Sequence, residues 1–254
     1  MTESIYTALL YAMPPMALIV FVALFWIKAG YGIFRTKAWG ISLPNKIGWI
    51  LMECPVFIVM LYLWMQSENR TEPILLTFFL LFELHYFQRT FIFPFLMKGH
   101  SKMPISIVLM GVVFNLINGF LIGESLFHLA PEGKYTSEWF TTPAFLIGTV
   151  IFFIGMGINL HSDHVIRNLR PKGDTKHYLP QKGMYRYVTS GNYFGELVEW
   201  TGYAILTQSV ASLIFVIWTF ANLAPRAYSI RKQYRKEFGK EAVGKRKCLI
   251  PYIY

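Results

Sequence analysis

A carboxyl group stands inside an apolar segment of this sequence, where hydrogen bonds are strong because water is scarce. Glu53 lies in the middle of Ile50-Leu-Met-Glu-Cys-Pro-Val-Phe57. Burying a carboxyl group in a membrane is energetically costly, so such an acid is a functional candidate by default. The alternative interpretation is a structural hydrogen bond from Glu53 to a neighbouring helix.

A second group of polar residues lies in Glu83-Leu-His-Tyr-Phe-Gln-Arg-Thr90. On a helix, Glu83, Tyr86 and Arg89 or Thr90 follow one another at successive turns of one face. That face is too polar to meet lipid. A helix end at the membrane surface would account for Arg89, but not easily for all four side chains.

Further polar residues lie around two later apolar segments. Asn159 and Asp163 are one helical turn apart, and Glu196 and Glu199 are three residues apart on an otherwise apolar helix. Two such acids need hydroxyl, amide or cationic partners. The ribose hydroxyls and carboxamide of a dinucleotide could supply them, and so could the arginines near the C-terminus.

The glycines and histidines of this region do not indicate a known ligand motif by themselves. A single Gly-x-Gly, such as the one at Gly155, indicates helix packing more often than nucleotide binding. No strand precedes it, which excludes a Rossmann fingerprint. The spacing of His161 and His164 does not match a helical metal pair. We therefore predict no metal site.

The elements that position these residues are membrane-spanning helices. The chain has 254 residues, of which 54% are hydrophobic and 15% charged, and its apolar residues form blocks of about 20, the length that crosses a bilayer. We predict an all-α integral membrane protein, a seven-transmembrane-helix bundle that forms a single domain over residues 1–254. The predicted spans are 6–27, 47–65, 73–97, 104–127, 143–166, 194–206 and 209–224.

Basic residues are concentrated in alternate connections. Of the 24 Lys and Arg residues, 21 lie in the stretches 28–46, 98–102, 167–186 and 226–247. The positive-inside rule then places the N-terminus outside and the C-terminus in the cytosol, because six spans would put the basic tail outside. The net charge of +10 thus reflects topology and suits a phosphate-bearing ligand. It is weak evidence for nucleic-acid binding, and we predict no nucleic-acid partner.

Several motifs together closely resemble the membrane steroid 5α-reductases, in matching order from the second span to the final residue. They are Glu53, His85-Tyr-Phe-Gln-Arg-Thr-Phe91, Gly155-Met-Gly-Ile-Asn-Leu-His-Ser-Asp163, Pro180-Gln-Lys-Gly183, Gly191-Asn-Tyr-Phe-Gly-Glu-Leu-Val-Glu-Trp200, Pro225-Arg-Ala-Tyr228 and Leu249-Ile-Pro-Tyr-Ile-Tyr254. The first span resembles the family only in its hydropathy.

The resemblance implies a reductase that saturates the 4,5 double bond of a 3-oxo-4-ene steroid with NADPH. It implies that Glu53 and Tyr86 hold the 3-ketone. The residues that it implies for the cofactor are Arg89, Asn159, Asp163, Arg170, His177, Tyr178, Asn192, Glu196, Arg226 and Tyr234. The chain departs from the family at Ile230, where many relatives carry a histidine, and at His177, where a tyrosine is common.

The residue chemistry agrees with that reaction. Hydride addition to the β-carbon of an enone pushes negative charge onto the ketone oxygen, so a hydrogen-bond donor there lowers the barrier. Tyr86 is the natural donor, and we expect Glu53 to be neutral in its apolar surround, so that it donates a hydrogen bond or orients the tyrosine. Arginines bind phosphates bidentately, which favours NADPH over NADH.

These features predict a multi-pass enzyme of the bacterial inner membrane or the endoplasmic reticulum. We predict a monomer that meets membrane lipid and a steroid or other lipid enone. Three alternatives remain open at this point. They are a reductase of another lipid alkene such as an enoyl thioester, a polyprenol or a sterol, an S-adenosylmethionine-dependent membrane methyltransferase, and a transporter or scaffold that is not an enzyme.

Overall fold

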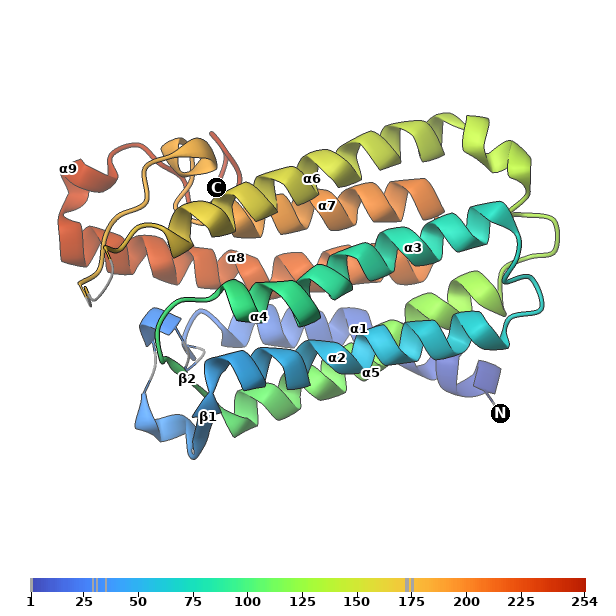
Figure 1. Cartoon of the computed structure of the whole chain (residues 1–254), viewed down its shortest axis with the longest axis horizontal. Coiled ribbons are helices and arrows are strands. Elements are labelled where there is room, and N and C mark those ends of the chain that lie inside the picture. The colour runs from blue at the N-terminus through green and yellow to red at the C-terminus, as the bar shows by residue number, and fades with distance from the viewer. Residues whose placement is uncertain (1, 29, 31, 35, 172–173, 175) are drawn as a thin grey trace.

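The protein is a bundle of helices that run along one long axis, with its two termini at opposite ends, as the computed structural model in Figure 1 shows. The structure describes residues 2–28, 30, 32–34, 36–171, 174 and 176–254. Its long helices are α1 (Thr2–Ala23), α2 (Asn45–Gln66), α3 (Pro73–Phe87), α5 (Ile105–Phe127), α6 (Pro143–Arg167), α7 (Gly191–Thr207) and α8 (Val210–Phe238). The predicted all-α architecture is confirmed.

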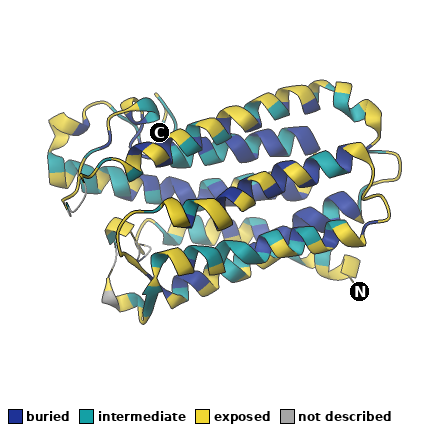
Figure 2. Cartoon of the chain, viewed as in Figure 1, coloured by how far each residue is buried: buried dark blue, intermediate teal, exposed yellow. Residues whose placement is uncertain are grey.

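Five of the described helices, α1, α2, α5, α6 and α8, are long and apolar enough to cross a membrane. Their large apolar side chains on the outer faces are exposed, whereas the interior of the bundle is buried (Figure 2). Such an apolar exterior is the surface that a lipid bilayer covers. The predicted spans 73–97 and 194–206 form helices that fall short of this length, so the count of seven crossings stays a prediction.

The connections with most basic residues gather at one end of the bundle. There β1 (Ser42–Pro44) pairs antiparallel with β2 (Lys102–Pro104). Lys98 Nζ donates to Asn168 Oδ1 at 2.7 Å, and the Thr189 amide donates to the Lys247 carbonyl at 2.9 Å. These three links join the first, third and fifth connections and the C-terminal segment, which are the four stretches that the charge pattern assigned to one side of the membrane.

Short elements complete the chain at both ends of the bundle. Besides α4 (Phe93–Leu96) and α9 (Lys240–Val243), they are the single turns η1 (Gly32–Phe34), η2 (Lys37–Trp39), η4 (Ser137–Thr141) and η5 (Gly183–Arg186), and a π-helical turn, η3 (Gln88–Ile92).

The π turn η3 divides the predicted third span. Pro94 has no N–H to donate to the Thr90 carbonyl, which removes one α-helical bond. The amide of the preceding residue, Phe93, donates to the Gln88 carbonyl, which is five residues back and not four. This wider turn continues into α4. Such turns often occur at functional sites, and this one carries Arg89.

The apolar stretch after residue 191 forms two antiparallel helices. Gln208 ends α7 in a left-handed conformation with φ 46°, and α8 begins two residues later. The helix α8 also extends past the end predicted for the last span, residue 224, to Phe238. The polar residues after Pro225 include Arg, Lys and Gln, which are good helix formers, so the helix continues beyond the apolar stretch.

Helices α6 and α7 pack with their backbones close together along four glycines, Gly148 and Gly155 on α6 and Gly195 and Gly202 on α7. A Cβ atom on Gly155 would overlap the backbone of Glu199, and one on Gly202 would overlap the backbone of Phe152. Close backbone approach at small residues is a common device of membrane helices. Gly157, by contrast, borders open space.

We expect Gly202→Ala to lower the free energy of unfolding by roughly 1–3 kcal/mol, because the added methyl group meets the α6 backbone. Gly157→Ala is the matched control, with room for the methyl group, and should be neutral or slightly stabilising. Thermal unfolding in detergent compares the two variants, and equal unfolding temperatures would show that the helices do not pack in this way.

Candidate active site

A buried arginine joins three helical segments at the basic end of the bundle. Arg89 donates from Nη1 to Asp163 Oδ2 at 2.7 Å and from Nη2 to Glu196 Oε2 at 3.0 Å. Its side chain is 8% exposed. Charge-assisted bonds of this kind are strong, and removing one member of a buried ion pair leaves an uncompensated charge. The π turn is thereby tied to both α6 and α7.

Two asparagines and a tyrosine extend this network. Asn192 Nδ2 donates to Asp163 Oδ1 at 3.2 Å, and Asn159 Nδ2 donates to the Asn192 carbonyl at 2.9 Å. Tyr185 Oη donates to Asn192 Oδ1 at 3.3 Å. Burial, together with the nearby Asp163 carboxylate, raises the pKa of Tyr185 well above its ordinary value, so the phenol stays a neutral donor.

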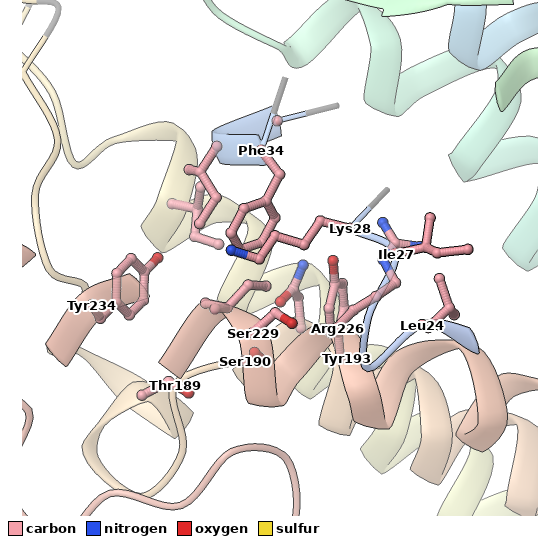
Figure 3. Close-up of a pocket in the computed structure, with 15 residues that line it drawn as sticks. Leu24, Ile27, Lys28, Phe34, Thr189, Ser190, Tyr193, Arg226, Ser229 and Tyr234 are labelled. Atoms are coloured by element: carbon pink, nitrogen blue, oxygen red, sulfur yellow. The ribbon is translucent and has the colours of Figure 1, made fainter. Parts of the chain in front are cut away.

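A cavity of about 240 Å³ opens beside this network, between the connection that follows α1 and the helices α7 and α8 (Figure 3). Its walls include Asn192, Arg226 and Tyr234 from the predicted cofactor set, and Lys28 and Ser190, which sequence reasoning did not propose. The Ser190 Oγ is buried and has no hydrogen-bond partner among the described residues. The cavity thus offers cations and a hydroxyl group to an anionic ligand.

Three residues of the predicted cofactor set lie elsewhere. Arg170 is exposed and within electrostatic range of Tyr234. His177 Nδ1 lies 2.8 Å from Glu237 Oε1, near the end of α8, and Tyr178 Oη donates to Asp174 Oδ2 within its own loop at 2.6 Å. None of these three lines the cavity described above.

The two residues predicted to hold a ketone come from neighbouring helices. Glu53 on α2 accepts a hydrogen bond from Asn115 Nδ2 on α5 at 3.2 Å. Tyr86 on α3 is 3% exposed, and its ring centroid lies 4.8 Å from that of Phe82 and 5.6 Å from that of Trp200. Glu53 and Tyr86 lie within electrostatic range of each other, and Glu53 is likewise within range of Arg89.

Sequence reasoning missed a pair beside Tyr86. His85 Nδ1 lies 2.8 Å from Glu199 Oε1, with both side chains buried. Among the described residues, the partners of Glu196 and Glu199 are Arg89 and His85, where the sequence also allowed the C-terminal arginines. Contact of these two acids with a dinucleotide stays a prediction. The sequence spacing could have indicated this pairing. His85 and Arg89 are four residues apart along α3 and η3, and Glu196 and Glu199 are three residues apart on the antiparallel helix α7.

We expect His85→Leu to lower the free energy of unfolding by roughly 3–5 kcal/mol, because it leaves Glu199 buried without its partner. Glu199→Gln keeps a hydrogen-bonding amide at the same place, so its expected loss is about 1 kcal/mol. Thermal unfolding in detergent measures both variants, and a larger loss in Glu199→Gln would contradict the assigned pairing.

Fold and site together define a multi-pass helical membrane protein with a buried polar site at its basic end. The chain belongs to the 3-oxo-5-alpha-steroid 4-dehydrogenase family, whose model matches residues 101–254. It is 38% identical over 229 residues to 3-oxo-5-alpha-steroid 4-dehydrogenase 1 of Macaca fascicularis, covering 88% of this chain and 84% of that protein. The corresponding human protein is also 38% identical, with 88% and 86% covered.

A plant relative covers more of both chains. Steroid 5-alpha-reductase DET2 of Gossypium hirsutum is 32% identical over 242 residues, which are 94% of this chain and 93% of that protein. The resemblance found in the motifs is thereby confirmed, and it extends over nearly the full length of the chain.

Proposed function

We propose that this protein reduces the 4,5 double bond of 3-oxo-4-ene steroids to 5α-dihydrosteroids with NADPH. The observation that carries the proposal is the juxtaposition of the partly buried Glu53 and the buried Tyr86 beside the Arg89 network, in a chain whose relatives are named 3-oxo-5-alpha-steroid 4-dehydrogenase or steroid 5-alpha-reductase. A phenol and a carboxyl group in an apolar interior suit a substrate whose only polar group near the reacting bond is a ketone.

Tyr86 has the central role in this proposal. Addition of hydride to C5 moves an electron pair through C4 onto the 3-ketone oxygen, and Tyr86 Oη–H stabilises that oxygen by donating a hydrogen bond. Glu53, neutral in its apolar surround, supports the same oxygen or orients the phenol. A proton from water then reaches C4, so the substrate gains one hydride and one proton in total.

NADPH, when bound, supplies the hydride. The Ser190 hydroxyl has no hydrogen-bond partner in the part of the chain that the structure describes. With Lys28 and Arg226 in the same cavity walls, it fits a phosphate group of such a cofactor. A cavity of about 240 Å³ is smaller than most sites for whole cofactors, so it would receive only part of the molecule. Asn192 lines this cavity and also bonds to Asp163, which connects the phosphate region to the Arg89 network.

We expect Lys28→Gln to weaken NADPH binding about tenfold, because a cation facing a phosphate is removed. Lys46→Gln is the matched control, since Lys46 is a basic residue at the same end of the bundle that does not line the cavity. Titration calorimetry at fixed ionic strength measures both. Equal weakening in the two variants would assign the effect to overall charge and not to the cavity.

The proposed topology has seven crossings, with the N-terminus outside and the C-terminus in the cytosol. In support, the helical segments α3, η3 and α4 follow one another without a break from Pro73 to Leu96, which is long enough to cross a bilayer. The paired basic connections then lie on the cytosolic side, where NADPH is present.

The function is tested by following NADPH oxidation by purified protein with progesterone and identifying the product's stereochemistry against standards. A 5α-dihydro product is expected. NADPH binding without turnover of any 3-oxo-4-ene steroid would instead favour a reductase of another lipid alkene. Stabilisation by S-adenosylmethionine but not by NADPH would favour the methyltransferase.

A further inference from the structure

Helix α6 carries a groove on its outer face that the proposed reaction does not use. The groove has a volume of about 290 Å³ and is lined by Phe153, Ile154, Gly157, Ile158, His161 and Met184. Five of these residues lie on α6, and Met184 comes from the η5 turn. A Cβ atom on Gly157 would meet no described atom within 4 Å. This glycine therefore leaves a notch in the middle of the groove.

The apolar part of the groove lies in a helix that is long and apolar enough to cross a membrane. Phe153 and Ile154 are about half exposed, on the outer face of α6 that is largely exposed in Figure 2. From Phe153 to His161 the helix rises about 12 Å, at 1.5 Å per residue. Hydrocarbon chains are the material that meets such a face inside a bilayer. The groove thus offers an extended apolar path that ends at a polar residue.

A lysine is held at the polar end of this face. Lys98 Nζ donates to Asn168 Oδ1 at 2.7 Å, and Asn168 Nδ2 donates to the His164 carbonyl at 2.9 Å. His164 and Asn168 follow Gly157 by seven and eleven residues, which places all three on one face of the helix. An ammonium group has three N–H donors, so Lys98 keeps donors for an anion while it is bonded to Asn168.

A second lysine comes from the loop before α7. A Cβ atom on Gly183 would overlap the ring of His161, so the chain at Gly183 lies against the polar end of the groove. The preceding residue, Lys182, is exposed. Lys98 and Lys182 thus come to this end from two different connections. Two cations beside an apolar groove match a molecule with an anionic head group and a hydrocarbon chain.

We propose that this groove binds one anionic glycerophospholipid, with an acyl chain over Gly157 and the phosphate group beside Lys98 and Lys182. The exposed imidazoles of His161 and His164 supply further hydrogen-bond donors to that phosphate, which gives a role to two histidines whose spacing does not suit a metal. The groove shares no lining residue with the proposed cofactor cavity. The lipid site is therefore independent of the proposed reaction.

Native mass spectrometry of the purified full chain tests the recognition of charge, with phosphatidylglycerol and with zwitterionic phosphatidylcholine of the same acyl chains. We expect one tightly bound phosphatidylglycerol per chain, and about tenfold or more weaker binding in the double variant Lys98→Gln/Lys182→Gln. Lys46→Gln is the matched control, because Lys46 is an exposed basic residue that does not line the groove, and it should bind as the wild type does. Equal affinities for the two lipids would overturn the proposal.

Gly157→Leu tests the apolar part of the groove by filling the notch. We expect it to weaken phosphatidylglycerol binding about tenfold, the value of about two buried methylene groups. Val113→Leu is the control, since Val113 is exposed on the outer face of α5, away from the groove. Unchanged binding in a monodisperse Gly157→Leu variant would refute the site. A dimer of the wild type that Gly157→Leu dissociates would assign the groove to a second copy of the chain instead.

Photolabelling locates the lipid without any substitution in the chain. A phosphatidylglycerol that carries a diazirine in its acyl chain is irradiated with the wild-type protein, and the labelled peptides are identified by mass spectrometry. We expect the label on Ile154, Ile158 or Met184, which line the groove, and its loss when unlabelled phosphatidylglycerol is added in excess. Label that is spread evenly over the exposed faces of α1, α2 and α5, with no preference for α6, would contradict the proposal.

Discussion

Tyr86→Phe is expected to lower kcat roughly 10²–10³-fold, the loss typical of removing one preorganised donor to a developing oxyanion. The change removes only the hydroxyl group, and the ring keeps its contacts with Phe82 and Trp200. The Kd for NADPH should therefore stay within about twofold of the wild-type value, since a phenylalanine at this position fills the same space. Stopped-flow measurement of NADPH oxidation under saturating steroid gives kcat directly.

A second buried phenol provides the matched control. Tyr203 on α7 donates to the Phe78 carbonyl at 3.1 Å, so Tyr203→Phe also removes a buried hydroxyl group that bonds across to α3. We expect it to lower stability while kcat remains near the wild-type value. Similar losses of kcat in both variants would mean that Tyr86 acts through packing of α3 and not through its proton.

Arg89→Met is expected to lower stability strongly and to abolish NADPH binding. It leaves the buried Asp163 and the partly buried Glu196 without their cation, for which we expect a loss of roughly 3–5 kcal/mol in the free energy of unfolding. Thermal unfolding with and without NADPH measures both effects. A variant that unfolds at the wild-type temperature and is still stabilised by NADPH would remove Arg89 from the site.

Arg89→Lys separates charge from geometry. A lysine keeps the positive charge but has no planar fork that can meet two carboxylates at once, so it should retain one of the two ion pairs. We expect an unfolding temperature between those of the wild type and Arg89→Met. Full recovery in the lysine variant would show that net charge alone holds α6 and α7 to the π turn.

Much of the fold could be predicted because membrane helices appear in a sequence as long blocks of apolar residues. The predicted span 104–127 differs by one residue from the start of α5, Ile105. The predicted span 209–224 does not mark the end of α8, which continues to Phe238, since a helix that leaves the membrane becomes polar while its backbone continues unchanged. The π turn at Gln88–Ile92 was also not foreseen, because Pro94 alone does not tell whether a helix kinks, ends or widens.

The candidate site could be predicted only in part. Family motifs pointed to Arg89, Asp163 and Asn192, which the structure joins directly. The pairing of His85 with Glu199 depends on the register of two antiparallel helices far apart in the sequence. Asn115 lies in an otherwise apolar helix, where an asparagine can also bond only to a neighbouring helix. Only the packing of α5 on α2 shows that Asn115 meets Glu53.

The walls of the cavity have a consequence for biosynthesis. Lys28 comes from the connection after the first helix, Ser190 precedes α7, and Tyr234 lies near the end of α8. The segment that carries Ser190 is in turn held by the bond from Thr189 to Lys247. A growing chain therefore has no complete cavity for the proposed cofactor until almost all of its helices have formed. The early helices must insert by their own hydrophobicity, and binding of the proposed cofactor can select only chains whose last helices are in place.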